Sequence, residues 1–160
     1  MRLGAGNRLT SLVTQRPRWI SDDLGAWTFR RLGCLSVDQA QQVIDRYFEV
    51  MGAGGDFSQF YVDEVTWTML DAGAEIRGAA DVRDYVIALH AQMSDVHTRR
   101  IVVSDNAAYL EGDCVNAQNE DAPRISYCVA YDVTGDRITA MRCVGTFGAI
   151  INQIQSADGP

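Results

Sequence analysis

Two stretches of this sequence decide the fold: Ile44-Asp45-Arg46-Tyr47-Phe48, and Gly55-Asp56-Phe57-Ser58-Gln59-Phe60-Tyr61-Val62-Asp63-Glu64-Val65-Thr66-Trp67. The first lies in a run from residue 36 to 51 whose apolar residues recur every three or four positions. That spacing predicts an amphipathic helix, which begins at a capping box (Ser36 to Gln39) and ends at Gly52. The second stretch starts with one or two helical turns and continues into β-branched and aromatic residues, which predict a strand.

The rest of the chain predicts a strand, a helix and then a meander. Asp71-Ala72-Gly73 forms a turn before a short strand at 74–77, and Gly78 breaks the chain before a second long helix that ends near Met93. Four strands follow, at about 96–104, 107–118, 124–133 and 137–147, and isoleucines from Ile150 onward predict one last apolar turn. We therefore expect an α+β fold, a cone in which the helices cover one face of a strongly curved sheet.

The last two predicted strands have apolar groups on both faces. Tyr127 and Val129 alternate with Cys128 and Ala130, and residues 138–147 repeat the pattern. A sheet with one face in water should alternate cleanly between apolar and polar side chains. We therefore predict a homodimer in which a second copy covers the outer face of the sheet.

The length of the chain limits the number of domains, and its charge limits the kinds of molecule it can bind. A chain of 160 residues holds one domain, which we place at 36–150, between an extension at 1–35 and a tail at 151–160. The net charge is −7, and the six arginines in residues 1–34 leave the remainder strongly acidic. Such a domain repels nucleic-acid backbones, and no apolar run is long enough to cross a membrane.

The cysteine pattern bears on location and metals. Cys34, Cys114, Cys128 and Cys143 form no CxxC pair and have no zinc-ligand spacing with either histidine. No signal-peptide pattern is evident at the N-terminus, so we expect reduced thiols and a cytoplasmic protein without a metal or other cofactor.

The sequence resembles the SnoaL-like branch of the nuclear transport factor 2-like superfamily. The resemblance rests on the two stretches quoted above, on Arg77-Gly78-Ala79-Ala80-Asp81-Val82-Arg83-Asp84-Tyr85, and on the turn Gly135-Asp136-Arg137-Ile138. It covers about residues 37–148 and implies the cone-shaped fold. The superfamily that it resembles includes ketosteroid isomerases, polyketide cyclases, limonene epoxide hydrolases and non-catalytic binders. The resemblance therefore implies a fold but not an activity.

None of these catalytic sets is complete in this chain. Tyr47 matches the oxyanion tyrosine of ketosteroid isomerases, but their proton-shuttling acid is replaced by Met69 and Leu70, with Asp71 slightly displaced. Their second acid, and the acid of the polyketide cyclases, fall on Cys128 or Val129, and the epoxide-hydrolase triad is also broken.

Two hypotheses therefore remain open. The first is a cofactor-free acid–base enzyme (isomerase, cyclase, dehydratase or hydrolase) acting on a hydrophobic, oxygenated small molecule. In it Asp113 and His97 move protons, Asp113 with a pKa raised by burial, and Tyr47 or Tyr127 holds a carbonyl oxygen. The second is a binding or structural module with the same cone but no turnover. The side chains that we expect to contact the small molecule are Trp67, Tyr109, Tyr127, His90 and Met141. Arg142 is a candidate anchor for an anionic group on it.

Overall fold

The computed structural model describes residues 39–157 of the chain. Residues 36–38 of the predicted capping box, the extension at 1–35 and the last three residues lie outside this range. The elements follow the predicted order. They are α1 (Gln39–Gly52), the short 3-10 helix η2 (Phe57–Phe60), β1 (Tyr61–Met69), β2 (Ala74–Arg77), α2 (Ala79–Ala91), β3 (Met93–Val103), β4 (Ala107–Asn116), β5 (Ile125–Thr134), β6 (Arg137–Gly145) and α3 (Gly148–Ala157).

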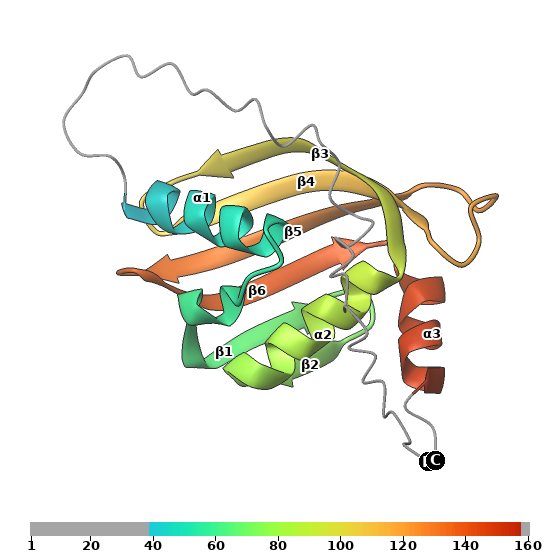
Figure 1. The fold of residues 1–160 in the computed structure, drawn as a ribbon, viewed down its shortest axis with the longest axis horizontal. Coiled ribbons are helices and arrows are strands. Elements are labelled where there is room, and N and C mark those ends of the chain that lie inside the picture. Colours follow the sequence, from blue (N-terminus) through green and yellow to red (C-terminus); the bar gives the residue numbers. More distant parts are fainter. Residues whose placement is uncertain (1–38, 158–160) are drawn as a thin grey trace, which may run out of the picture.

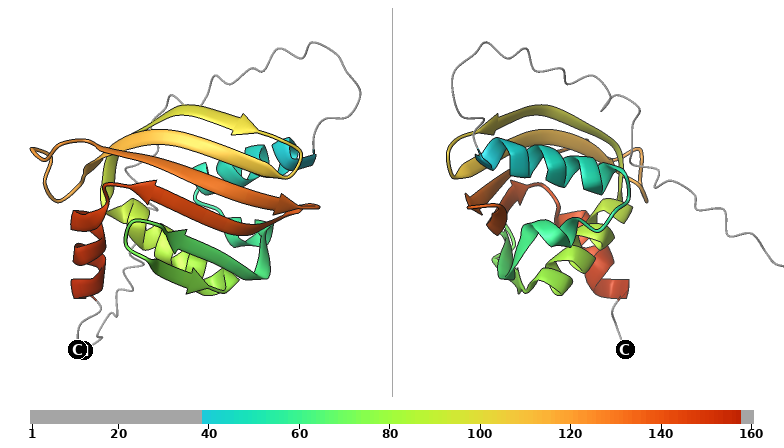
Figure 2. Two further views of the ribbon diagram at one scale, coloured as in Figure 1. Left: turned by 180° about the vertical axis from the view of Figure 1, so that it is seen from behind. Right: turned by 60° about the vertical axis from the view of Figure 1, so that its left-hand side comes forward.

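The strands form one open six-stranded sheet in the order β2-β1-β6-β5-β4-β3. β1 and β6 are parallel and every other neighbouring pair is antiparallel, so the sheet is mixed. Figure 1 shows α1 and α2 over the concave face and α3 beside the end of the sheet. From behind, the outer face carries none of the described helices (Figure 2, left). The predicted α+β cone is confirmed, as a curved sheet that does not close.

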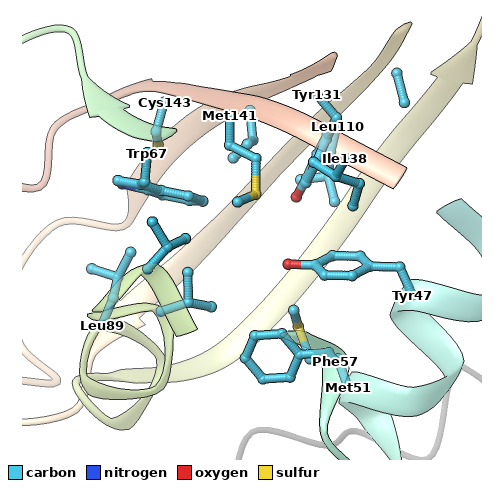
Figure 3. Close-up of a cluster of buried hydrophobic side chains, with 14 of the residues drawn as sticks. Tyr47, Met51, Phe57, Trp67, Leu89, Leu110, Tyr131, Ile138, Met141 and Cys143 are labelled. Atoms are coloured by element: carbon cyan, nitrogen blue, oxygen red, sulfur yellow. The ribbon is translucent and has the colours of Figure 1, made fainter. Parts of the chain in front are cut away.

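The core lies between the concave face and the helices. The stripe predicted on the first helix is buried there, through Ala40, Val43, Ile44, Tyr47 and Met51. Figure 3 shows side chains from α1, α2 and the sheet meeting in this layer. Burial of the same regularly spaced apolar side chains that predicted this helix therefore holds it against the sheet.

Two elements differ from the prediction. The third strand begins at Met93, which the apolar spacing had placed on the second helix, and its buried side chain continues the core from the strand. The single apolar turn expected at the C-terminal end is a ten-residue helix, α3. Ile150 is fully buried, Ile151 and Ile154 pack against the core, and α3 lies beside α2, so tertiary packing extends the helix.

Candidate functional site

A cavity of about 340 Å³ lies between the helices and the concave face. Its size falls at the lower end of the range for small-molecule sites. Three elements supply most of its apolar wall: α1 with Phe48 and Met51, α2 with Val86 and Leu89, and β5 with Val129. No aspartate, glutamate or arginine belongs to the wall that the structure describes. Its polar groups are phenols, imidazoles, an indole, a threonine and a thiol.

A cluster of tyrosines forms the α1 end of the cavity. The hydroxyls of Tyr47 and Tyr61 lie 3.0 Å apart in a buried hydrogen bond, and the ring of Tyr131 packs edge-on against Tyr47. Tyr47 and Tyr131 line the cavity, whereas Tyr61 supports Tyr47 from behind. Burial raises the pKa of all three phenols, so they stay protonated and able to donate at neutral pH.

The α2 end contains Trp67 and His90, as expected from the sequence. Figure 3 shows Trp67 reaching in beside Cys143 on the side opposite Tyr47. The indole Nε1 of Trp67 is buried without a hydrogen-bond partner among the described residues. Burial lowers the pKa of His90 to about 4, so its imidazole is neutral at pH 7. Burial also raises the pKa of the Cys143 thiol to about 12, which makes it a poor nucleophile.

Tyr127 lies in the cavity wall because its neighbours in the sheet are glycines. Gly112 on β4 and Gly145 on β6 are its register partners. A Cβ on Gly112 would lie 2.8 Å from the Tyr127 hydroxyl, and a Cβ on Gly145 would lie 2.8 Å from the Tyr127 Cβ. The missing side chains give the ring space to lie across β4. The sequence showed both glycines but not what they accommodate.

Asp113 differs from our expectation. It is 4% exposed, but it does not line the cavity: it shares the outer face of β4 with Tyr109, which is 50% exposed. Its carboxylate accepts hydrogen bonds from Arg99 Nε at 2.7 Å and Arg124 Nε at 2.5 Å. Burial alone would raise the pKa of Asp113, but the hydrogen bonds and charges of Arg124 and Arg99 outweigh it, so the pKa is lowered. The predicted raised pKa is wrong, because the sequence did not reveal the two arginines.

His97 lines the cavity, but both of its ring nitrogens have partners. Arg124 Nη2 lies 3.2 Å from Nδ1, and Asp95 Oδ1 lies 3.2 Å from Nε2. Because a guanidinium can only donate, Nδ1 of a neutral His97 accepts and Nε2 carries the proton toward Asp95. Neither nitrogen is free to take a proton from a molecule in the cavity.

The remaining candidates lie outside the cavity wall. Tyr109 lines a shallow groove on the outer face of the sheet, and Met141 is fully buried in the core. Asp71 accepts a hydrogen bond from the amide of Gly145 at 2.7 Å, which holds the end of β6. Arg142 forms two hydrogen bonds with Asp132, at 2.6 and 2.7 Å. These contacts give Asp71 and Arg142 structural partners.

Sequence reasoning missed Tyr131 and Arg124 as site residues. Tyr131 belongs to the same alternating set as Tyr127 and Val129, so the strand period could have placed it on the concave face. Arg124 lies at the end of a polar loop, where nothing in the sequence indicates that it reaches β3 and β4.

The SnoaL-like domain profile matches residues 44–141, more than half of the chain. The chain belongs to the SnoaL-like domain family. No curated protein is detectably similar in sequence.

Solved structures share the fold of this SnoaL-like domain. A steroid delta-isomerase from Pseudomonas aeruginosa aligns with a TM-score of 0.62 at 10% identity, over 78% of this chain and 91% of its own. An NTF2-like protein of unknown function from Cytophaga hutchinsonii gives 0.54 at 17% identity, over 69% and 99%. A de novo designed protein with a curved β-sheet gives 0.61 at 15% identity, over 77% and 99%. At these identities the likeness shows the nuclear transport factor 2-like fold alone.

Two further properties of this SnoaL-like domain concern metals and membranes. Within residues 39–157, no three His, Cys, Asp or Glu side chains are placed to hold a metal ion. In the same part of the chain, every helix is too short or too polar to cross a bilayer.

Proposed function

We propose that this SnoaL-like domain binds a neutral, hydrophobic molecule with at least one oxygen acceptor. The observation that carries the proposal is the cavity wall, which is largely apolar and, among residues 39–157, contains hydrogen-bonding groups but no carboxylate or guanidinium. A charged ligand would lose its hydration there without gaining an opposite charge, whereas a ketone or ester would lose little.

The donors in the wall support an oxygen acceptor on the ligand. Either hydroxyl can donate in the Tyr47–Tyr61 hydrogen bond, and when Tyr61 donates, Tyr47 can donate its own proton to the ligand. The buried Nε1 of Trp67 is a second donor, on the other side of the cavity, that an acceptor would satisfy.

The test is a titration with Prodan, a neutral naphthalene ketone whose emission shifts in apolar surroundings. We expect saturable binding of Prodan and weaker binding of the anionic dye anilinonaphthalene sulfonate. The hydrocarbon-like analogue 2-dimethylaminonaphthalene, which lacks the ketone, should also bind more weakly. Equal binding of the anion and the ketone would contradict the proposal.

A second candidate is acid–base isomerisation in the same cavity. It is supported by the neutral imidazole of His90 and the phenol of Tyr47, which both line the cavity, and by the isomerase among the proteins of like fold. His90 would take a proton from the carbon next to a carbonyl whose oxygen Tyr47 holds, and would return that proton to the γ-carbon. Conversion of a β,γ-unsaturated ketone to its conjugated isomer, followed by ultraviolet absorbance, distinguishes turnover from binding.

We also propose that two copies associate through the outer face of the sheet. Val102, Tyr109 and Val144 expose apolar surface there, beside the Asp132–Arg142 ion pair. In a two-fold interface the same patch meets itself, so apolar groups can pack on apolar groups and the ion pair can meet the ion pair of the second copy. The free thiols of Cys114, Cys128 and Cys143 support a location in the reducing cytoplasm.

A further inference from the structure

The start of β3 contains two bulges. Ser94 pairs with Val115 and His97 with Asp113, so β3 has one extra residue between these pairs. Thr98 pairs with Gly112 and Arg100 with Glu111, which leaves Arg99 as a second extra residue. Each bulge bends a strand and increases its twist, so two in succession turn this end of β3 sharply.

This bent segment forms one wall of the cavity. Val96, His97 and Thr98 all line it. Val96 and Thr98 are half-buried, whereas the His97 side chain between them is 60% exposed. The shape of this wall therefore depends on the bulges keeping their conformation.

The first bulge is strained at Asp95. Its φ is +47°, in the left-handed region that a residue with a Cβ adopts at a cost. Arg124 holds it there: Nη1 donates to Asp95 Oδ2 at 2.5 Å and Nη2 donates to the Asp95 carbonyl at 2.8 Å. The same guanidinium therefore donates hydrogen bonds to both the side chain and the backbone of Asp95.

Asp113 connects the two bulges. It faces His97 from β4 and accepts from Arg124, which holds the first bulge, and from Arg99, which is the extra residue of the second. Arg124 also fixes the tautomer of His97, as described above. One side chain from the loop before β5 thus contacts Asp95, His97 and Asp113.

We infer that Arg124 is a positioning residue for the cavity: it holds the doubly bulged start of β3 so that Val96, His97 and Thr98 form the wall that meets the ligand. This inference rests on the proposed function. The alternative is that Arg124 belongs to a surface ion-pair cluster that contributes only to stability. In that case, loss of Arg124 would leave the cavity wall in place.

The test compares Arg124→Gln with Arg142→Gln. Arg142 is a matched control, because its side chain is 38% exposed, as is that of Arg124, and it is ion-paired, but with Asp132 on the outer face. We expect Arg124→Gln to weaken Prodan binding about five- to tenfold and to speed amide hydrogen exchange at residues 93–100. Arg142→Gln should leave both unchanged, whatever it does to the melting temperature.

A rescue variant separates positioning from direct contact. Glycine adopts a φ of +47° without the penalty of a Cβ, so Asp95→Gly should restore the bulge when Arg124 is absent. We expect the double variant to recover most of the lost affinity. Unchanged affinity in Arg124→Gln, exchange that rises evenly over the chain, or no rescue would each overturn the inference. If the unaltered chain does not bind Prodan, the proposed function fails, and the exchange measurement still decides whether Arg124 holds the bulge.

Discussion

The hydroxyls of Tyr47 on α1 and Tyr61 at the start of β1 lie 3.0 Å apart, and both side chains are buried. Of these two tyrosines, Tyr47 lines the cavity and Tyr61 does not. When Tyr61 donates within this pair, the cavity has a phenol whose proton can go to a ligand.

Removing the Tyr47 hydroxyl should weaken binding of a ketone but not of an analogue that lacks the ketone. We expect Tyr47→Phe to lose about five- to tenfold in Prodan affinity, the equivalent of one hydrogen bond of about 1 kcal/mol. Its affinity for 2-dimethylaminonaphthalene should not change. Tyr109→Phe, which removes a phenol outside the cavity, is the control. Equal losses for both probes would show that the hydroxyl does not contact the ketone.

Asp113 should contribute to stability in a pH-dependent way. Its pKa is lower in the folded chain than its ordinary value, so its contribution is complete above the unfolded pKa and is lost as the pH falls through the folded one. We expect Asp113→Asn to lower the free energy of unfolding by about 1–3 kcal/mol at pH 7, because two arginines lose their acceptor. The difference from the unaltered chain should shrink as the pH falls below 4. Asp136→Asn, at an exposed position, should change little in urea unfolding at either pH.

His90 should cause a second pH dependence of the free energy of unfolding, at higher pH than that of Asp113. Its pKa of about 4 in the folded chain lies below the ordinary value of about 6.5, so the unfolded chain binds the proton first. Stability should therefore be full above pH 6.5 and fall by up to about 3 kcal/mol as the pH drops toward 4. His90→Gln should remove this dependence. A variant with the same pH profile as the unaltered chain would show that other groups cause it.

The outer face of the sheet should control association. Val144 is 45% exposed there, so we expect Val144→Asp to convert a dimer to a monomer in light scattering. Ile87→Asp is the control, because Ile87 is 51% exposed on α2, away from this face. A monomeric unaltered chain at micromolar concentration would contradict the proposed dimer.

The sequence predicted helices and strands better than it predicted which side chains contact one another. The three- and four-residue spacing around Tyr47 and the β-branched run ending at Trp67 placed α1 and β1, because burial periodicity is local. The same local reasoning placed Trp67, Tyr47, Tyr127, His90 and His97 in one cavity wall. It failed at Tyr109 and Met141, which lie outside the wall, and at Asp113, whose arginine partners come from a bulge in β3 and from a loop before β5. Such long-range pairs follow from bends in the strands, which residue spacing does not encode.

The most direct test of the cavity as a ligand site is methyl NMR with isotope-labelled methionine. Met51 and Met93 line the cavity, whereas Met69 and Met141 are buried outside its wall. With bound Prodan, we predict nuclear Overhauser effects from the probe to the methyl groups of Met51 and Met93 but not to those of Met69 and Met141. Effects at none of these four methyl groups, with binding still saturable, would place the ligand elsewhere and contradict the account.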